Sequence, residues 1–114
     1  MAQYAVLIYE DEKAYERGGQ EASDAVYRAH GEFTAANGAA LRGGNALQPT
    51  GTATSIHQDE SGEFLVTDGP YTETREALGG FYIIEAADLD EAIAVAKQVP
   101  ARFGGVEVRP VMSV

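Results

Sequence analysis

The chain has 114 residues and a formal net charge of -10, from 18 acidic and 8 basic residues. This length fits one domain over residues 1–114, and so acidic a surface disfavours binding to nucleic acid or to anionic membranes. The sequence contains no cysteine, which excludes disulfides, thiolate catalysis and cysteine zinc sites. We expect no signal peptide and no transmembrane span, and because a reducing compartment suits this composition, we expect a cytoplasmic location.

The N-terminal half is expected to form a strand and then a helix. Residues 3–9 are rich in β-branched and aromatic types and predict a central strand. Residues 10–21 are charged and contain a glycine pair, which favours a loop. The next segment predicts a helix from Ser23, as N-cap, to about Asn37, with His30 at the edge of its apolar face. That face comprises Ala22, Val26, Ala29, Phe33 and Ala36. Residues 41–51 are rich in turn formers, with Leu41 and Leu47 as anchors.

The C-terminal half contains most of the predicted strands. Residues 53–58 and 63–68 predict two strands joined by a turn at 59–62, and residues 79–86 predict a third. Asp88 and Glu91 have the spacing of a capping box at the start of a helix that runs to about Val99. Leu89, Ile93 and Ala96 are its predicted buried stripe, with Ala92 beside it. Residues 104–112 alternate like an edge strand.

This order, β-α-β-β-β-α-β, predicts an α+β fold of ferredoxin-like type, with an antiparallel sheet and two helices on one face. The strand at 79–86 carries apolar side chains on both faces, and two helices cover only one side of a sheet. Leaving the other face in water is unfavourable. We therefore expect a homodimer that packs sheet on sheet.

A family likeness covers nearly the whole chain. Residues 66–100, VTDGPYTETREALGGFYIIEAADLDEAIAVAKQVP, together with AVLIY at 5–9, the helix with His30 and VEVRP at 106–110, resemble the YCII-related family in its DGPF subgroup. Tyr71 stands where that subgroup has phenylalanine. The resemblance implies a bacterial protein, a dimeric α/β-barrel of ferredoxin-like subunits, and an active site with His30 and Asp68. It also implies association with an extracytoplasmic-function sigma factor, but no settled reaction.

Asp68-Gly69-Pro70 has two interpretations. Asp68 can accept backbone N–H groups in a turn in which Pro70 sets the next φ, which needs no ligand. Alternatively, Gly69 lets a ligand approach the backbone, with Pro70 and Tyr71 beside it, while Asp68 orients an imidazole or takes a proton. His30 is likewise either a packed histidine bonded to a backbone carbonyl or an acid/base group that titrates near neutrality.

Other polar residues give weaker signals. His57 and Asp59 share a strand face and, with Glu60, imitate a metal site, but no third fixed ligand follows, so we expect no metal. Tyr9, Tyr71 and Tyr82 either line a pocket or belong to the core. Arg75 and Arg109 either bind an anionic ligand or, as we expect in so acidic a chain, pair with Glu73, Glu76 or Glu107.

Two functions fit these observations. The first is a cofactor-independent enzyme, such as an isomerase or lyase of lactone type, which uses His30 as acid/base and Asp68 as its orienting partner on a small organic molecule. The second is a non-catalytic dimer that binds a metabolite or a protein partner such as a sigma factor.

Overall fold

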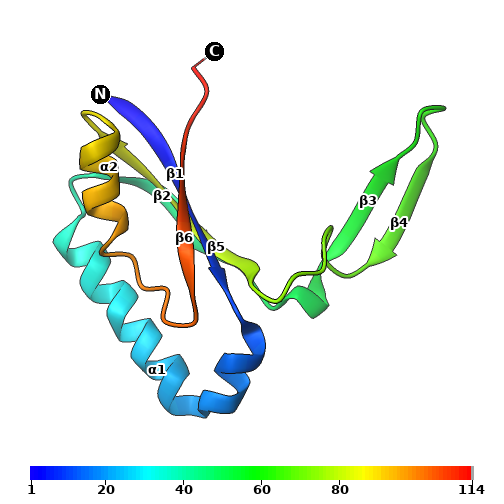
Figure 1. Ribbon diagram of the computed structural model, residues 1–114, viewed down its shortest axis with the longest axis horizontal. Helices are drawn as coiled ribbons and strands as arrows, with labels where there is room; N and C mark the ends of the chain where they lie inside the picture. The colour runs from blue at the N-terminus through cyan, green and yellow to red at the C-terminus, as the bar shows by residue number, and fades with distance from the viewer. Residues whose placement is uncertain (114) are drawn as a thin grey trace.

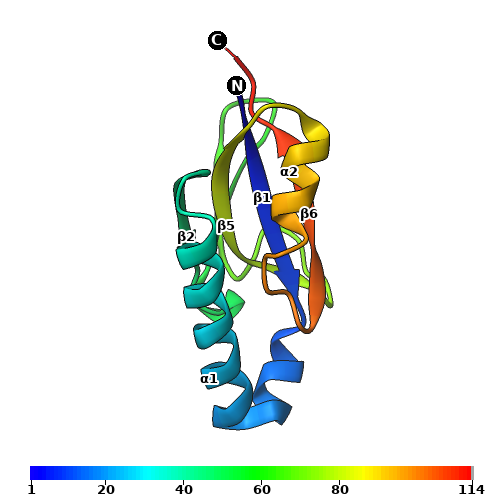
Figure 2. The same ribbon diagram turned by 90° about the vertical axis from the view of Figure 1, so that its left-hand side faces the viewer.

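The computed structural model describes residues 1–113 and shows an α+β fold (Figure 1). A four-stranded antiparallel sheet has the order β2-β5-β1-β6, and both helices lie over one of its faces (Figure 2). This is the order of a ferredoxin-like fold and confirms the predicted fold class. The elements of this body are β1 (Ala2–Glu10), α1 (Glu12–Ala36), β2 (Leu41–Ala46), β5 (Ala77–Ala86), α2 (Leu89–Ala96) and β6 (Gly104–Pro110). No helix within residues 1–113 has the length and apolar character needed to cross a membrane.

The core lies between the sheet and the two helices. Alternate residues of β1 point toward the helices, because successive side chains of a strand face opposite ways. Tyr4, Val6 and Ile8 are buried there, and Ile84 of β5 joins them with no exposed surface. Phe33 supplies the contact from α1. The predicted central strand at 3–9 is therefore confirmed.

Helix α1 begins eleven residues earlier than Ser23, so the predicted loop at 10–21 is wrong. Asp11 is the N-cap, and its carboxylate accepts a hydrogen bond from the Lys13 backbone N–H at 3.0 Å. The glycine pair divides α1 into two helical segments that meet at a kink, because Gly19 has φ 62° and ψ -154°. Such a left-handed φ suits glycine and bends the chain. The stop at Asn37 is confirmed, since its N–H donates to the Phe33 carbonyl at 3.0 Å.

Strand β2 was not predicted, because its sequence LRGGNA has the composition of a turn. It forms the sheet edge by pairing with β5, from Leu41 opposite Ile84 to Ala46 opposite Gly80. In chain order, β2 and β5 are therefore the second and third strands of the ferredoxin-like sheet. The two strands at 53–58 and 63–68 exist but form an insertion between them, which corrects the place that we expected for that pair.

Helix α2 has the predicted cap but presents a different face to the sheet. The Glu91 N–H donates to Asp88 Oδ1 at 2.9 Å, and the Glu91 carboxylate accepts from the Ala87 N–H at 3.2 Å. Ala92 and Ala96 are buried, whereas Leu89 and Ile93 are 48% and 37% exposed. The prediction that Leu89 and Ile93 are buried is therefore wrong. The helix also ends at Ala96, before the predicted Val99.

The inserted strands form a separate two-stranded hairpin that projects from the sheet on the side opposite the helices (Figure 1). It contains β3 (Thr54–Gln58) and β4 (Phe64–Asp68) and follows the short 3-10 turn η1 (Thr50–Thr52). The predicted turn at 59–62 is confirmed, because Gly62 N–H donates to the Asp59 carbonyl at 3.0 Å. We call residues 54–68 the arm.

Candidate functional site

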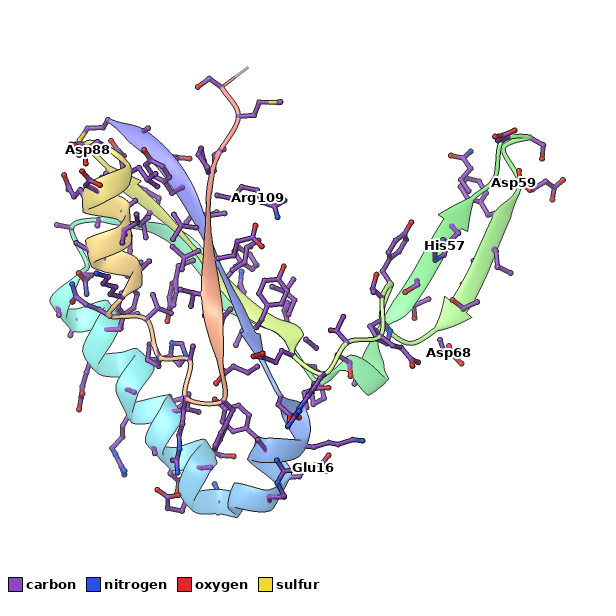
Figure 3. The ribbon with its side chains drawn as sticks, viewed as in Figure 1. Glu16, His57, Asp59, Asp68, Asp88 and Arg109 are labelled. Atoms are coloured by element: carbon purple, nitrogen blue, oxygen red, sulfur yellow. The ribbon has the colours of Figure 1, made fainter. Side chains whose placement is uncertain are left out.

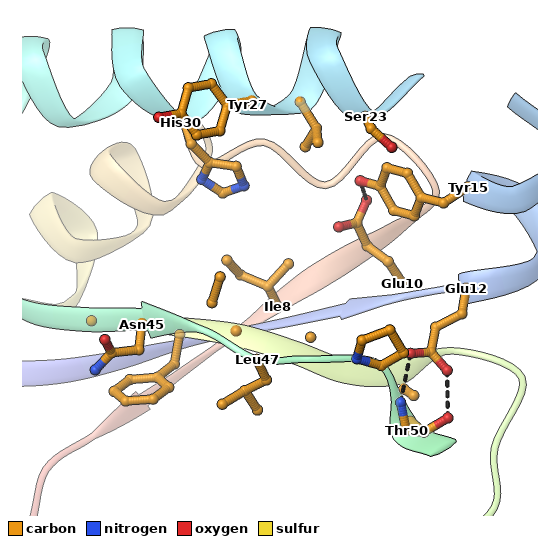
Figure 4. Close-up of a pocket in the computed structure, with 18 of the residues that line it drawn as sticks. Ile8, Glu10, Glu12, Tyr15, Ser23, Tyr27, His30, Asn45, Leu47 and Thr50 are labelled. Carbon is orange, nitrogen blue, oxygen red and sulfur yellow. Dashed lines mark hydrogen bonds between the residues drawn. The ribbon is translucent and has the colours of Figure 1, made fainter. Parts of the chain in front are cut away.

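An open cleft of about 1200 Å³ lies between α1 and the β2–β5 side of the sheet (Figure 4). Ile8 forms part of its floor, and Tyr27 and His30 reach it from α1. Leu47 lines it as well. The turn after β2, with Pro49 and Thr50, closes one end. Mostly apolar walls with a few convergent polar groups are typical of a small-molecule site.

His30 and Tyr82 form a polar pair on the wall of this cleft. His30 Nδ1 lies 2.7 Å from the Tyr82 hydroxyl oxygen, within hydrogen-bonding distance. The Tyr82 ring also packs against Phe33, with ring centroids 4.8 Å apart. Because Phe33 follows His30 by three residues on α1, both reach the same strand. Packing of the buried Phe33 therefore orients α1 so that His30 faces Tyr82.

The surroundings keep both groups uncharged near neutral pH. Burial lowers the pKa of His30, and the carboxylate of Glu10 opposes this only in part. Burial raises the pKa of Tyr82, so its hydroxyl stays protonated. Within residues 1–113, the hydrogen bonds leave His30 Nε2 without a protein partner. The pair therefore offers a neutral imidazole nitrogen and a phenol to a molecule in the cleft.

Two glutamates line the same end of the cleft as Thr50 and make structural hydrogen bonds there. Glu10 accepts from the Tyr15 hydroxyl at 2.6 Å and from the Phe103 N–H at 3.1 Å. Burial and this carboxylate raise the pKa of Tyr15. Glu12 accepts from Thr50 twice, at 2.8 Å from the N–H and 2.5 Å from the hydroxyl (Figure 4). Glu12 therefore ties the first turn of α1 to the turn after β2.

The predicted site residues lie in two different places. His30 lines the cleft. Asp68 ends β4 at the base of the arm (Figure 3), Gly69, Pro70 and Tyr71 follow it in the chain, and none of the four lines the cleft. Within one chain the structure therefore does not bring His30 and Asp68 together. The contacts at Gly69 extend the β3–β4 pairing: its N–H donates to the Ala53 carbonyl at 2.8 Å, and its carbonyl accepts from the Ser55 hydroxyl at 2.7 Å. Its φ of 105° suits glycine. Tyr71 stacks on His57 with centroids 4.3 Å apart.

The remaining candidates have contacts of their own. Asp59 Oδ1 accepts from the Ser61 and Glu63 backbone N–H groups, which stabilises the turn of the arm. Within residues 1–113, no three His, Cys, Asp or Glu side chains gather where they could hold a metal ion. Arg109 pairs with Glu107 as predicted. Arg75 instead pairs with Asp11 at 3.5 Å, which is not one of the glutamates that we expected.

Sequence reasoning named Tyr82 as a pocket candidate but did not pair it with His30. The available signal was the alternation of β5, which places Tyr82 on the same face as Ile84 and thus toward the helices. Glu10, Glu12 and Tyr15 were missed because residues 10–21 were interpreted as a loop. No short-range pattern in that segment indicated that its acidic side chains turn toward the sheet.

Comparison with known proteins agrees with the family likeness. The family model described as the YCII-related domain matches residues 2–114. An uncharacterized protein of Rhizobium meliloti (strain 1021) is 36% identical over 115 residues, which cover 94% of this chain and 90% of that protein.

Proposed function

Because the chain belongs to the YCII-related family and carries a polar pair in an apolar cleft, we propose that it catalyses proton transfer on a small organic molecule without a cofactor. The observation that carries this proposal is the 2.7 Å contact between His30 Nδ1 and the Tyr82 hydroxyl on the cleft wall. General acid–base catalysis needs a positioned group whose proton affinity suits neutral pH, and histidine serves this role most often. Assignment to the DGPF subgroup, based on Asp68-Gly69-Pro70, is part of the proposal.

Tyr82 gives the histidine a defined role in this mechanism. When Nδ1–H donates to the Tyr82 oxygen, the lone pair on Nε2 faces outward and can take a proton from a carbon next to a carbonyl group. The Tyr82 O–H then remains free to donate to the carbonyl oxygen, on which negative charge develops. Returning the proton from Nε2 to a different carbon completes an isomerisation, with atoms and charge balanced.

The charge of the cleft favours a neutral substrate. Glu10 and Glu12 line one end, and Glu16 stands exposed at its rim. A carboxylate or phosphate ligand would meet their negative field in addition to the net charge of -10. An unsaturated lactone or an enolisable ketone suits both the apolar walls and the acid–base pair.

We further propose that the protein is a homodimer that covers the second face of the sheet. Ala5 lies opposite Ile83 and Leu7 lies opposite Phe81 on that face, and neither helix covers it (Figure 2). These four apolar side chains form a contiguous patch suited to sheet-on-sheet packing. The pair of His30 with Asp68 requires the Asp68 of a second copy, because within one chain Asp68 does not reach the cleft.

Deuterium exchange tests the proposed chemistry. A panel of unsaturated γ-lactones and β-keto esters is incubated with the protein in deuterium oxide, and proton NMR follows exchange at the carbon next to the carbonyl group. We expect exchange with the wild type and a loss of about 100-fold or more with His30→Gln, since a general base contributes about that much. Tyr82→Phe should also slow exchange, whereas His57→Gln, outside the cleft, should not.

The alternative function predicts the opposite result. A protein that exchanges no member of the panel and shows no thermal shift with any of them would contradict the enzymatic proposal. Tight binding of an extracytoplasmic-function sigma factor in the same preparation would then favour the non-catalytic regulatory module.

A further inference from the structure

The arm has one bare apolar face. Its strand register places Ile56 opposite Val66 and Gln58 opposite Phe64, so these side chains point to one face. Ile56, Phe64 and Val66 are 58%, 67% and 61% exposed. The other face carries one exposed apolar side chain, Leu65, and is partly covered by the chain itself, since Ser55 is buried and Tyr71 stacks on His57. Three large apolar groups in water on an isolated hairpin are unfavourable, and two-stranded hairpins are only marginally stable alone.

The dimensions of the chain also indicate a missing partner. The radius of gyration is 16.0 Å, whereas a compact domain of this length is expected to have about 13 Å. The accessible surface is 7829 Å², about 1800 Å² more than expected for a compact monomer of this mass. A standard interface buries only about 800 Å² per partner. The uncovered surface is therefore large enough for an extensive interface that includes more than the sheet.

We propose that the arm clasps a second copy of this chain and is covered there through Ile56, Phe64 and Val66. This inference rests on the homodimer proposed above. The arm projects on the side of the sheet opposite the helices (Figure 1). The half-buried patch of Ala5, Leu7, Phe81 and Ile83 lies on the same side, so one partner can contact both the patch and the arm. Packed sheets lie about 10 Å apart, and each strand of the arm spans about 17 Å. The arm consequently reaches past the sheet of the second copy toward its helices.

Dimerisation through the arm also bears on the cleft. The arm begins directly after η1, and Thr50 and Gly51 of that turn line the end of the cleft. Glu12 holds Thr50 by two hydrogen bonds. A docked arm fixes the outer end of this segment, while Glu12 fixes the inner end. Docking of the arm thus holds the end wall of each cleft from a second side.

Sedimentation equilibrium at micromolar protein tests the proposal with three variants. Val66→Lys places a charge on the bare face of the arm, and Thr67→Lys places the same charge on its neighbour, which points to the opposite face. Ile83→Lys disrupts the sheet patch. We expect a wild-type dimer, at least a tenfold rise in the dissociation constant for Val66→Lys and Ile83→Lys, and little change for Thr67→Lys. Circular dichroism confirms that each variant is folded.

The outcomes separate the two proposals. If Ile83→Lys dissociates while Val66→Lys remains as dimeric as Thr67→Lys, the arm proposal is overturned and the dimer stands. A monomeric wild type overturns both, and neither result bears on the acid–base chemistry at His30. A second measurement needs no destabilising charge: because the chain has no native cysteine, Val66→Cys and Thr67→Cys can be labelled with a maleimide. We expect the thiol at 66 to react at least about tenfold more slowly in the dimer, and equal rates would refute coverage of this face.

Discussion

Replacing Tyr82 with phenylalanine should isolate the energetic contribution of the His30–Tyr82 contact. The substitution removes one hydroxyl and leaves the ring against Phe33, so the core keeps its packing. The lost hydrogen bond is 2.7 Å long and lies between partly buried side chains. A neutral hydrogen bond of this kind contributes about 1 kcal/mol net to stability. In a domain of this size that loss lowers the melting temperature by about 4 °C.

Urea denaturation followed by circular dichroism measures this change, at one fixed protein concentration because association adds to stability. Tyr27→Phe is the matched control, since Tyr27 is 83% exposed on the same helix as His30. Its free energy of unfolding should change by less than about 0.5 kcal/mol. A double-mutant cycle with His30→Ala should give a coupling energy of about 1 kcal/mol between the two sites. Zero coupling, with Tyr82→Phe no less stable than Tyr27→Phe, would refute our reasoning about the pair.

Three further substitutions or titrations test the fold and the site. The pKa of His30, followed by NMR, should lie below its ordinary value of 6.5 because the side chain is partly buried. The contribution of His30 to the free energy of unfolding is therefore complete above pH 6.5. It is lost as the pH falls through the lower pKa of the folded state. A pKa at or above 6.5 would contradict this, and His30→Gln should flatten the stability profile in that range. Gly19→Ala should destabilise the protein by about 1–3 kcal/mol because its φ of 62° disfavours a side chain. Gly31→Ala in the same helix should instead stabilise by up to about 1 kcal/mol, because an added Cβ there meets open space. If both substitutions changed the free energy of unfolding in the same direction, the result would contradict the break at Gly19. Ile84→Ala removes a fully buried side chain and should reduce the free energy of unfolding by about 2–5 kcal/mol. Ile93→Ala should reduce the free energy of unfolding by about 1 kcal/mol or less, since Ile93 is 37% exposed. An equal loss for Ile84→Ala and Ile93→Ala would instead support the burial of Ile93 that we first expected for α2.

Local sequence patterns were sufficient to predict the elements whose signals are short-range. Strand β5 is dense in β-branched and aromatic residues, and the cap of α2 depends on side chains three residues apart, so short-range patterns were sufficient for both. The turn of the arm likewise lies within a few residues of its own donors and acceptors. The order of the predicted elements indicated the ferredoxin-like class, although it assigned the two strands of the arm to the middle strands of the sheet.

Features that depend on partners far apart in the sequence became visible only in the folded chain. Strand β2 exists because β5 offers it a ladder of hydrogen bonds, although LRGGNA has little intrinsic preference for a strand. His30 and Tyr82 meet across 52 positions of sequence because Phe33 packs helix α1 onto β5. Asp68 is separated from the cleft because the hairpin is an insertion that leaves the sheet. Burial and pairing of this kind depend on which surfaces the whole chain brings together, which no local pattern specifies.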